Sequence, residues 1–400
     1  MPAPGKSKQN PAARKSLKSN GKNGPKRLEK PAEQGEETAS QTSAALPIEL
    51  QQLILNIFKD SFPERIGSHL TELLQQIKKH LFNRDFDKAF GRDDYLEAYA
   101  VRWSASRAVG YLYPLYETIG ALLRTKELGT REIVLAGGIS SHPAQNNAPR
   151  RDIKIACLGG GAGAEIVSLG GVLNLLLRCD GQSLQSKEEQ KEGEKTSTSL
   201  TSIHFDIKLI DVANWDRISR TLHGHITTPP ALSKYASATV RALSVPLAPA
   251  SNFTATFHQQ DLLNLTSEKL AKLLGTPDLV TLFFTLNELY TTSISQTQLF
   301  LHTLTACVQT GTLFLIVDSA GSYSTVSLNG ASKKYPMHWL IDHTLVPEPT
   351  STREEGTAKW EKLKEEESRW SRIPEGLKYA LELENMRFQL HLYRRLSGCA

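Results

Sequence analysis

Cysteines and long apolar runs are scarce in this chain. Among its 400 residues the four cysteines stand far apart and form no CxxC pair: Cys157, Cys179, Cys307 and Cys399. This spacing argues against a zinc site or a disulfide framework and suits a reducing compartment. No run of 18 apolar residues occurs, and the first residues lack the apolar core of a secretion signal. We therefore expect no metal, no membrane partner and no secretion.

Acidic residues are almost missing from the first 30 positions. That stretch holds nine Lys or Arg and only Glu29, so the rest of the chain is net acidic although the whole carries +5. With few apolar residues the tail cannot bury a core, and we expect it to be disordered. Such tails bind nucleic-acid phosphates or serve nuclear import. A merely solubilising leader is the alternative.

Two kinds of hydrophobic pattern follow the tail. We assign a disordered tail and linker to 1–46 and an N-terminal helical region to 47–130, where apolar residues recur at steps of three and four. A third region, 131–400, alternates short apolar strands with helices, which predicts a mostly parallel sheet covered on both faces. Its charged, Ser-rich stretch 180–202 reads as a low-complexity insertion in a surface loop.

The predicted strands and helices of the third region follow one another in regular alternation. The strands are Ile153–Leu158, Phe205–Asp211, Phe253–Phe257, Leu279–Phe284 and Thr312–Asp318, and the helices include Ala164–Leu177, one starting near Trp215, and Ile294–Gln309. Residues 133–136 form a short apolar stretch between turns. Alternation in Asn385–Arg395 predicts a late antiparallel strand, for which we expect Lys378–Leu383 as partner. The charged stretch 352–370 reads as a solvated helix.

Glycines crowd between the first of these strands and its helix, in "CLGGGAGAEIVSL". Gly159, Gly161 and Gly163 let the backbone turn sharply and approach a ligand at the start of the helix. Dinucleotides use such loops for a pyrophosphate, in the pattern GxGxxG. S-adenosylmethionine (SAM), which has no phosphate, uses them for its amino acid and ribose. The loop departs from strict GxGxxG because Glu165 follows the helix start.

Acidic and polar residues at successive strand ends help to choose between these ligands. Asp211 ends the second strand, where a carboxylate can accept both ribose hydroxyls, and Asp261 follows the third, where it can accept from an adenine amino group. A helix cap or turn is the alternative for each. The fourth strand ends in "TLNELY", which places Asn287, Glu288 and Tyr290 at the ligand-binding edge of an open α/β sheet. The series, with a final antiparallel strand, favours a methyltransferase over a dehydrogenase.

Five stretches of the chain resemble one family. They are "YAVRWSASRAVGYLYPL" (Tyr99–Leu115), "CLGGGAGAEIVSL", "LIDVANW" (Leu209–Trp215), "FTLNELYT" (Phe284–Thr291) and "LENMRFQLHLYRRL" (Leu383–Leu396). Over roughly residues 48–397 the chain resembles the fungal SAM-dependent methyltransferase family that includes the 25S rRNA uridine-N3 methyltransferase. The resemblance implies a class I methyltransferase fold, a Rossmann-like seven-stranded sheet with an antiparallel final strand, plus an N-terminal helical extension. It also implies SAM as methyl donor and a uridine of large-subunit rRNA as substrate.

The expected site residues combine the strand ends with the first of these stretches. Asn287 and Glu288 are candidates for the chemistry, Glu288 as a base, although a structural carboxylate is its alternative. Trp103 and Arg107 are candidate substrate contacts, and Arg102 a candidate for the SAM carboxylate or a phosphate. Tyr99, Trp103 and Arg107 are spaced to share a helix face; their alternative is a packed helix with Arg tips in water. Tyr290 can stack on a base or pack in the core.

The sequence leaves several functions open. The chain is expected to be an RNA methyltransferase that meets rRNA or a pre-ribosome in the nucleus or nucleolus, and a cytoplasmic pool is compatible. We assume a monomer. The alternatives are a methyltransferase acting on a protein or small molecule, a dinucleotide-dependent oxidoreductase, and a ribosome assembly factor that kept the methyltransferase fold without its activity.

Overall fold

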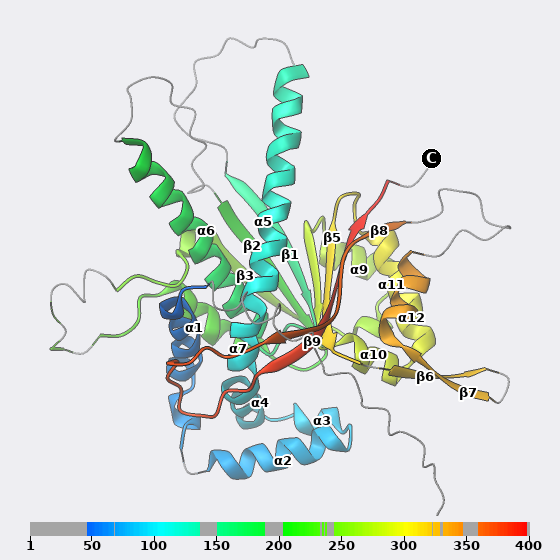
Figure 1. Ribbon diagram of the computed structural model, residues 1–400. Coiled ribbons are helices and arrows are strands. Elements are labelled where there is room, and N and C mark those ends of the chain that lie inside the picture. Colours follow the sequence, from blue (N-terminus) through cyan, green and yellow to red (C-terminus); the bar gives the residue numbers. More distant parts are fainter. Residues whose placement is uncertain are drawn as a thin grey trace, which may run out of the picture. The chain divides into compact units, whose positions relative to one another are not determined.

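A seven-stranded sheet organises the described part of the chain. In this computed structural model the strand order is β3-β2-β1-β4-β5-β9-β8 (Figure 1). The first five strands are parallel, and β9 runs antiparallel to both neighbours. Their bounds are β1 Arg151–Leu158, β2 Ile203–Asp211, β3 Phe253–Gln259, β4 Leu279–Phe283, β5 Leu313–Ser319, β8 Trp360–Ser371 and β9 Met386–Arg395. This order and the reversed β9 confirm the predicted class I methyltransferase fold.

Helices cover both faces of the sheet. The structure describes residues 46–67, 69–136, 150–188, 203–232, 234–235, 237, 244–321, 323–328, 331–346 and 359–397. The helices are α1 Ile48–Ser61, α2 Leu70–Phe82, α3 Phe86–Ala89, α4 Asp93–Tyr99, α5 Ala105–Ala136, α6 Ala164–Glu188, α7 Asp216–Thr227, α9 Ser267–Leu274, α10 Leu286–Thr292, α11 Ile294–Cys307 and α12 Met337–Leu345. All these residues belong to one unit, Thr38–Ala400. The predicted disorder of the tail lies outside the described residues.

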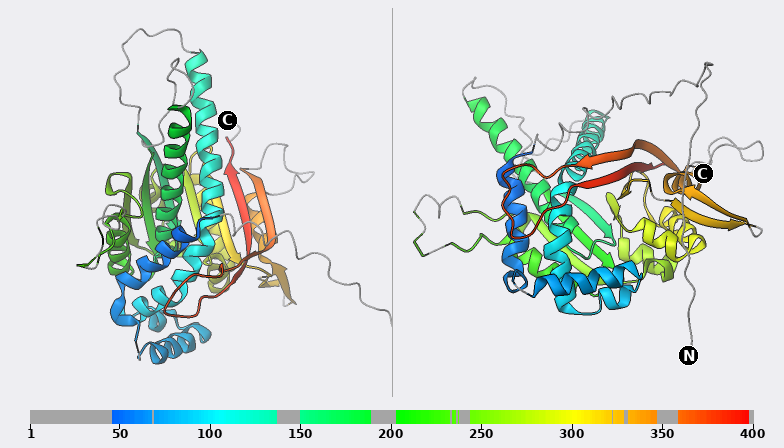
Figure 2. Two further views of the ribbon diagram at one scale, coloured as in Figure 1. Left: turned by 60° about the vertical axis from the view of Figure 1, so that its left-hand side comes forward. Right: turned by 60° about the horizontal axis from the view of Figure 1, so that its bottom comes forward.

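Alternate residues of each central strand enter two different cores. In β1, Ile155 and Cys157 pack with α1, α5, α6 and α7, whereas Ala156 and Leu158 pack with α9 to α12. Burial of both faces explains why β4 and β5 are mainly apolar. Figure 2 shows the two helical layers from further sides. No described helix is long and apolar enough to span a bilayer.

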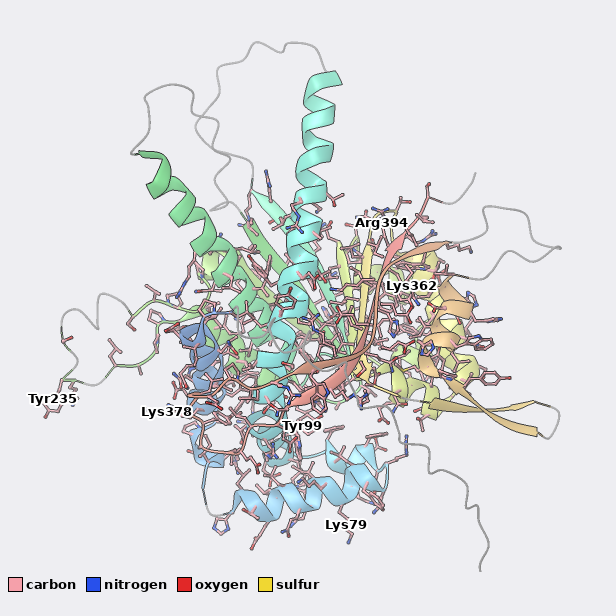
Figure 3. The ribbon with its side chains drawn as sticks, in the orientation of Figure 1. Lys79, Tyr99, Tyr235, Lys362, Lys378 and Arg394 are labelled. Carbon is pink, nitrogen blue, oxygen red and sulfur yellow. The ribbon has the colours of Figure 1, made fainter. Side chains whose placement is uncertain are left out.

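The two strands at the antiparallel edge correct two predictions. The stretch read as a solvated helix forms β8 from Trp360 onward, and residues 352–358 lie outside the described part. Its charges suit an edge strand, where Lys and Glu discourage further pairing. Glu361 faces Arg394 across the β8–β9 pair with a 2.5 Å ion pair, and Arg394 and Lys362 are labelled in Figure 3. A helical reading of this stretch cannot anticipate such a cross-strand pair.

The expected partner of the last strand is also wrong. Strand β9 pairs with β5 and β8, not with residues 378–383. That segment crosses to the helical extension instead, where the Lys378 N–H donates to Gln52 of α1 and the Tyr379 hydroxyl donates to the Val101 carbonyl, each over 2.7–2.8 Å. Figure 3 shows Lys378 beside α1. The segment therefore ties α1 to the residues that lead into α5.

Two helices run further than their sequences indicate. Helix α5 continues through the short apolar stretch 133–136, where we expected turns, and α6 continues to Glu188, beyond the predicted end at Leu177. The start of the predicted insertion is thus helical, and residues 189–202 lie outside the described part. The other predicted strands agree with the structure within two residues.

Two smaller elements flank the carboxyl ends of the parallel strands. The five residues Ala100–Ser104 between α4 and α5 form a π-helical turn, which is rare and is frequent at functional sites. After β5, the strands β6 (Tyr323–Leu328) and β7 (Ala331–Pro336) form a separate antiparallel hairpin. The hairpin contacts α10 and leads into α12, and Figures 1 and 2 show it extending past α10.

Candidate functional site

The glycine loop is enclosed by protein side chains. Gly159 and Gly163 have φ angles of +76° and +91°, which glycine adopts without the strain of a Cβ. A Cβ on Gly159 would lie 2.1 Å from Thr285 Oγ1, and one on Gly161 would lie 2.3 Å from the Trp215 ring. The loop therefore approaches the end of β4 and the start of α7 more closely than any other residue type permits.

Asp211 lies directly against this loop. Its carboxylate accepts hydrogen bonds from the Gly161 N–H over 3.1 Å and the Ala213 N–H over 3.2 Å. Burial raises the pKa of Asp211 to about 6, although the backbone donors oppose the rise. It caps no helix, since α7 begins after Trp215 without a side-chain cap. A buried acid at this place suits recognition of hydroxyl donors such as those of a ribose.

Glu165 is a site residue that sequence reasoning noted only as a departure from a pattern. It is 3% exposed, and it accepts from the Thr281 hydroxyl of β4. Burial raises its pKa to about 8, against opposing hydrogen bonds from Thr281 and Cys157. A Cβ on Gly160 would lie 2.6 Å from its Oε2 atom. Glu165 thus places a second acid beneath the loop; the available signal was a charged residue in an otherwise apolar helix.

The π-helical turn aligns the residues opposite the loop. In a regular α-helix, residues eight apart diverge by about 80° around the axis, and the extra residue of a π-turn reduces this to about 20°. Arg107 Nη1 can therefore donate to the hydroxyl of Tyr99 over 2.7 Å, and the Tyr99 and Trp103 rings lie 4.9 Å apart. The prediction that these three residues share a face is confirmed. Tyr99 is labelled in Figure 3 at the start of this helix.

Tyr99 also connects this face with the glycine loop. Its ring centroid lies 5.8 Å from that of Trp215, the residue packed on Gly161, and 5.3 Å from that of Phe90. The sequence of contacts from Gly161 through Trp215 and Tyr99 to Arg107 forms an aromatic wall. The loop and the π-turn therefore belong to one site at the carboxyl edge of the sheet.

Arg107 keeps its charge in a crowded place. Its guanidinium carbon lies 5.0 Å from the ring centroid of Phe284, at the end of β4. Burial lowers its pKa, but the hydroxyls of Tyr99 and Tyr111 and the Asp318 carboxylate outweigh burial and raise it. Within the described part of the chain, the hydrogen bond to Tyr99 uses one of the five N–H hydrogens of the Arg107 guanidinium. The remaining donors are suited to an acceptor-rich ligand.

Phe284 is held in a strained conformation. Its φ of +52° falls in the left-handed region, which is unusual for a bulky residue and costs about 1–3 kcal/mol. Its N–H donates to the Val317 carbonyl over 2.7 Å, and its ring stacks near that of Tyr111 at 6.2 Å. Such strain is concentrated at functional sites. Here it turns the chain from β4 into α10 beneath Arg107.

The start of α10 brings Asn287 and Glu288 to the edge of the sheet. Asp318, at the end of β5 and 1% exposed, accepts from the Asn287 N–H over 3.0 Å. Burial raises the pKa of Asp318 to about 6. Glu288 is half-exposed and pairs with Arg84 over 3.4 Å, which joins α10 to the segment after α2. Asp318 was missed by the sequence reasoning, although, like Asp211, it ends a strand.

The remaining predicted residues have other partners in the structure. Asp261 caps a short 3₁₀ helix, accepting from the Leu263 N–H over 3.0 Å and the Asn264 amide over 2.6 Å. Arg102 forms an ion pair with Glu384, and Tyr290 is 2% exposed within the second core. The structure thus groups Asp211, Trp103, Arg107, Asn287 and Glu288 around the sheet edge, and Tyr290 packs in the core. Arg102 stays a candidate, because its guanidinium carbon lies 5.9 Å from the Trp103 ring centroid and its Nη1 atom is buried without a hydrogen-bond partner among the described residues.

Comparison with known proteins identifies the family. A family model described as "Putative SAM-dependent methyltransferase" matches residues 58–394, most of the chain. This chain belongs to that SAM-dependent methyltransferase family. It is also 31% identical, over 353 residues, to the "25S rRNA (uridine(2843)-N(3))-methyltransferase" of Saccharomyces cerevisiae. The match covers 86% of this chain and 85% of the yeast protein.

Solved methyltransferase structures show weaker likeness. A SAM-dependent methyltransferase from Methanosarcina mazei is 10% identical with a TM-score of 0.31, covering 64% of this chain and 99% of the other. The N-methyltransferase NodS from Bradyrhizobium japonicum, solved with S-adenosyl-L-homocysteine, is 9% identical with a TM-score of 0.29, covering 61% and 79%. At these scores neither structure adds support, and the fold stands on its own strand order.

The residues around the glycine loop fit SAM as the donor of this methyltransferase. No Lys or Arg occurs in residues 155–177, and the acids Asp211 and Glu165 lie against the loop. The Asp211 carboxylate disfavours a pyrophosphate, and the Glu165 carboxyl, mostly protonated at neutral pH, can ionise beside a ligand with ammonium and sulfonium charges. The observed charges therefore argue against a dinucleotide. In the described part of the chain, no group of three or more His, Cys, Asp or Glu side chains could hold a metal ion.

Proposed function

We propose that this methyltransferase transfers a methyl group from SAM to N3 of a uridine in large-subunit ribosomal RNA. The observation that carries the proposal is the match to the yeast 25S rRNA uridine-N3 methyltransferase, which spans 86% of this chain. The stretch that carries the π-turn and the strand-end residues lies within the region matched by the family model. We also propose that the protein acts in the nucleus or nucleolus, which the basic tail supports.

The donor half of the proposed site consists of the glycine loop and its acids. Gly159, Gly161 and Gly163 allow the backbone to lie close to the ligand, and Asp211 would accept from the two ribose hydroxyls. Asp261 would accept from the adenine amino group, in exchange for its present bonds within the short helix. SAM supplies an activated methyl group on a sulfonium, so the protein's main task is to hold the acceptor in line with it.

The acceptor half must favour loss of the uridine N3 proton. In the reaction, N3 forms a bond to the methyl carbon, the carbon–sulfur bond breaks, and the N3 proton leaves for a base or water. Negative charge then develops on N3 and the neighbouring carbonyl oxygens of uracil. We propose that the free donors of Arg107 bind this developing charge, held in place by Tyr99. Trp103 and Tyr99 form the wall beside the base.

The polar start of α10 is the proposed place of proton transfer. Glu288 is half-exposed, so a proton taken from N3 can pass on to water. Asn287, fixed by Asp318 through its own N–H, would bond the imide edge of the uracil. Because a base must leave its stack to enter such a site, the aromatic wall also provides it with a new surface.

The decisive experiment is nucleoside mass spectrometry of large-subunit rRNA from cells that lack the protein. Loss of one 3-methyluridine, restored by the wild type and not by Asp211→Ala, is the expected result. An rRNA profile that is unchanged by deletion would overturn the proposal. Restoration by Asp211→Ala would instead separate the modification from the SAM site and point to an assembly role.

A further inference from the structure

Three aromatic side chains, two of them exposed and one half-buried, form a stack outside the site described above. Tyr335 ends the β6–β7 hairpin, and Trp339 and His343 follow on α12 at intervals of four residues. The Tyr335 and Trp339 ring centroids lie 4.9 Å apart with planes inclined by 20°, and those of Trp339 and His343 lie 5.2 Å apart at 25°. We call these three residues the aromatic ladder.

Tyr335 is half-buried against the second core, whereas Trp339 and His343 lie outside the core and are exposed. Trp339 is 47% exposed. The structure describes all five tryptophans of the chain, and the other four are buried or half-buried. The opposite side of α12, including Met337, Leu340 and Ile341, is buried in the second core. An exposed stack of large rings gains little from folding, and such surfaces mark sites of interaction.

The ladder is connected to the proposed acceptor site. The hairpin that leads into it begins directly after β5, whose end carries Asp318, and it contacts α10, which carries Asn287 and Glu288. Figures 1 and 2 both show the hairpin next to α10. A strand of RNA with its target base at α10 has the hairpin and α12 as neighbouring surfaces.

The charge of this region suits a polyanion. Residues 323–341 contain Lys333 and Lys334 and no acid. The next residue, Asp342, is neutralised from within, because its carboxylate binds Lys362 over 2.5 Å and the Tyr393 hydroxyl over 2.8 Å. A segment of the chain that carries lysines and no acids and leads to exposed rings suits single-stranded nucleic acids, which are bound through phosphate attraction and base stacking.

We propose that the aromatic ladder stacks unpaired bases of the RNA next to the target uridine. The three rings are already nearly parallel, so a nucleobase can extend the stack without further ordering of side chains. Stacking tolerates any base, so the ladder would contribute affinity and placement more than sequence choice. This inference rests on the proposed RNA substrate and adds to it a second contact surface outside the catalytic site.

The test compares three full-length variants on unmodified large-subunit rRNA stripped of proteins. Trp339→Ala removes the central ring, Trp339→Phe keeps an aromatic ring, and Tyr235→Ala removes a 95% exposed aromatic on a distant loop shown in Figure 3. We expect Trp339→Ala to raise the KM for RNA about fivefold or more. Its kcat, SAM affinity and thermal unfolding should match the wild type, and both other variants should stay within about twofold in KM.

Photocrosslinking with 4-thiouridine-substituted rRNA provides the second measurement. Crosslinks to residues 335–343 support the ladder, and their absence in a protein that crosslinks elsewhere overturns it. A loss seen with pre-ribosomal particles but not with protein-free rRNA would show a protein partner and also overturn it. If the wild type methylates no rRNA, the proposed function has failed, a result distinct from a methylating enzyme whose KM ignores Trp339.

Discussion

The two halves of the sheet edge recognise charge in opposite ways. The glycine-loop half, defined by the loop with Asp211 and Glu165, holds buried acids whose pKa values are raised to about 6 and about 8. The aromatic half, defined by Tyr99, Trp103, Arg107 and Phe284, holds a guanidinium among rings. A cationic donor and an acceptor that becomes anionic need such complementary halves. Near pH 7 the charges of the free site are those of Asp211, whose pKa is about 6, and of Arg107, whereas Glu165, with a pKa of about 8, is mostly protonated until a cation binds.

The strongest test of this comparison removes the charge of the aromatic half. We expect Arg107→Ala to lower kcat about 100-fold or more, because loss of a donor to developing charge costs about 3 kcal/mol. SAM affinity, a property of the other half, should change less than twofold. Single-turnover methylation of rRNA and calorimetric SAM binding measure the two effects.

Two further variants separate charge from packing at this position. Arg107→Lys keeps the charge but loses the fork geometry, and should recover part of the rate. Arg387→Ala removes an arginine that packs on Trp370 of β8, the outermost strand of the sheet, and should leave kcat unchanged. Equal losses of SAM affinity and kcat in Arg107→Ala would contradict the division into two halves.

The second test changes the buried acid of the glycine-loop half. The pKa of Glu165 rises from 4.5 to about 8 on folding, so its contribution to stability is present at low pH and is lost as pH rises toward 8. The glutamine of Glu165→Gln does not titrate. We expect the stability of Glu165→Gln relative to wild type to increase by roughly 2 kcal/mol between pH 6.5 and 8.

Urea unfolding at several pH values measures this change. Glu268→Gln, which alters an exposed acid on α9, is the matched control and should show no such trend. Near pH 7, SAM binding to wild type should also release a proton that calorimetry in buffers of different ionisation enthalpy detects. A flat pH trend for Glu165→Gln would mean that Glu165 is already ionised in the free protein, so that SAM binding releases no proton from it.

A third, smaller effect concerns the hydrogen bond that the π-turn makes possible. Tyr99→Phe keeps the ring against Trp103 and Trp215 but removes the hydroxyl that accepts from Arg107. We expect kcat to fall about three- to tenfold, the value of one hydrogen bond, with unchanged SAM affinity. Steady-state kinetics on rRNA check it. A variant as impaired as Arg107→Ala would show that Tyr99 does more than orient the guanidinium.

The parts that sequence could predict are those with local signals. Strand β1, the glycine loop and Asp211 follow one another within or just after apolar stretches, and their parallel order requires only alternation of strands and helices. Strand β8 could not be recognised because its Lys and Glu residues satisfy a helical pattern as well, and only the opposed Arg394 decides between them. Its partner choice is a tertiary property.

The candidate site was predicted unevenly for the same reason. Tyr99, Trp103 and Arg107 were grouped from their spacing, but the π-turn that aligns them depends on packing against α1 and the segment 378–384. Asp261 and Tyr290 illustrate the reverse: a correct strand end does not tell whether a side chain faces a ligand, a cap or the core. Glu165 was undervalued because its acid acts from below the loop, through Thr281.

The smallest effect tests whether the helical extension contributes to the aromatic half. Arg84 has a φ of +55° and reaches from the segment after α2 to Glu288 over 3.4 Å, with both side chains about half exposed. Exposed ion pairs contribute about 0.2–1 kcal/mol and weaken with salt. We expect Arg84→Ala to lower kcat less than about fivefold at low salt and hardly at all at 0.5 M salt, as measured by rRNA methylation.

Lys88→Ala, which breaks the nearby pair with Asp85, is the control. If Arg84→Ala abolishes activity at both salt concentrations, Arg84 contacts RNA directly, and the aromatic half extends into α2 and α3.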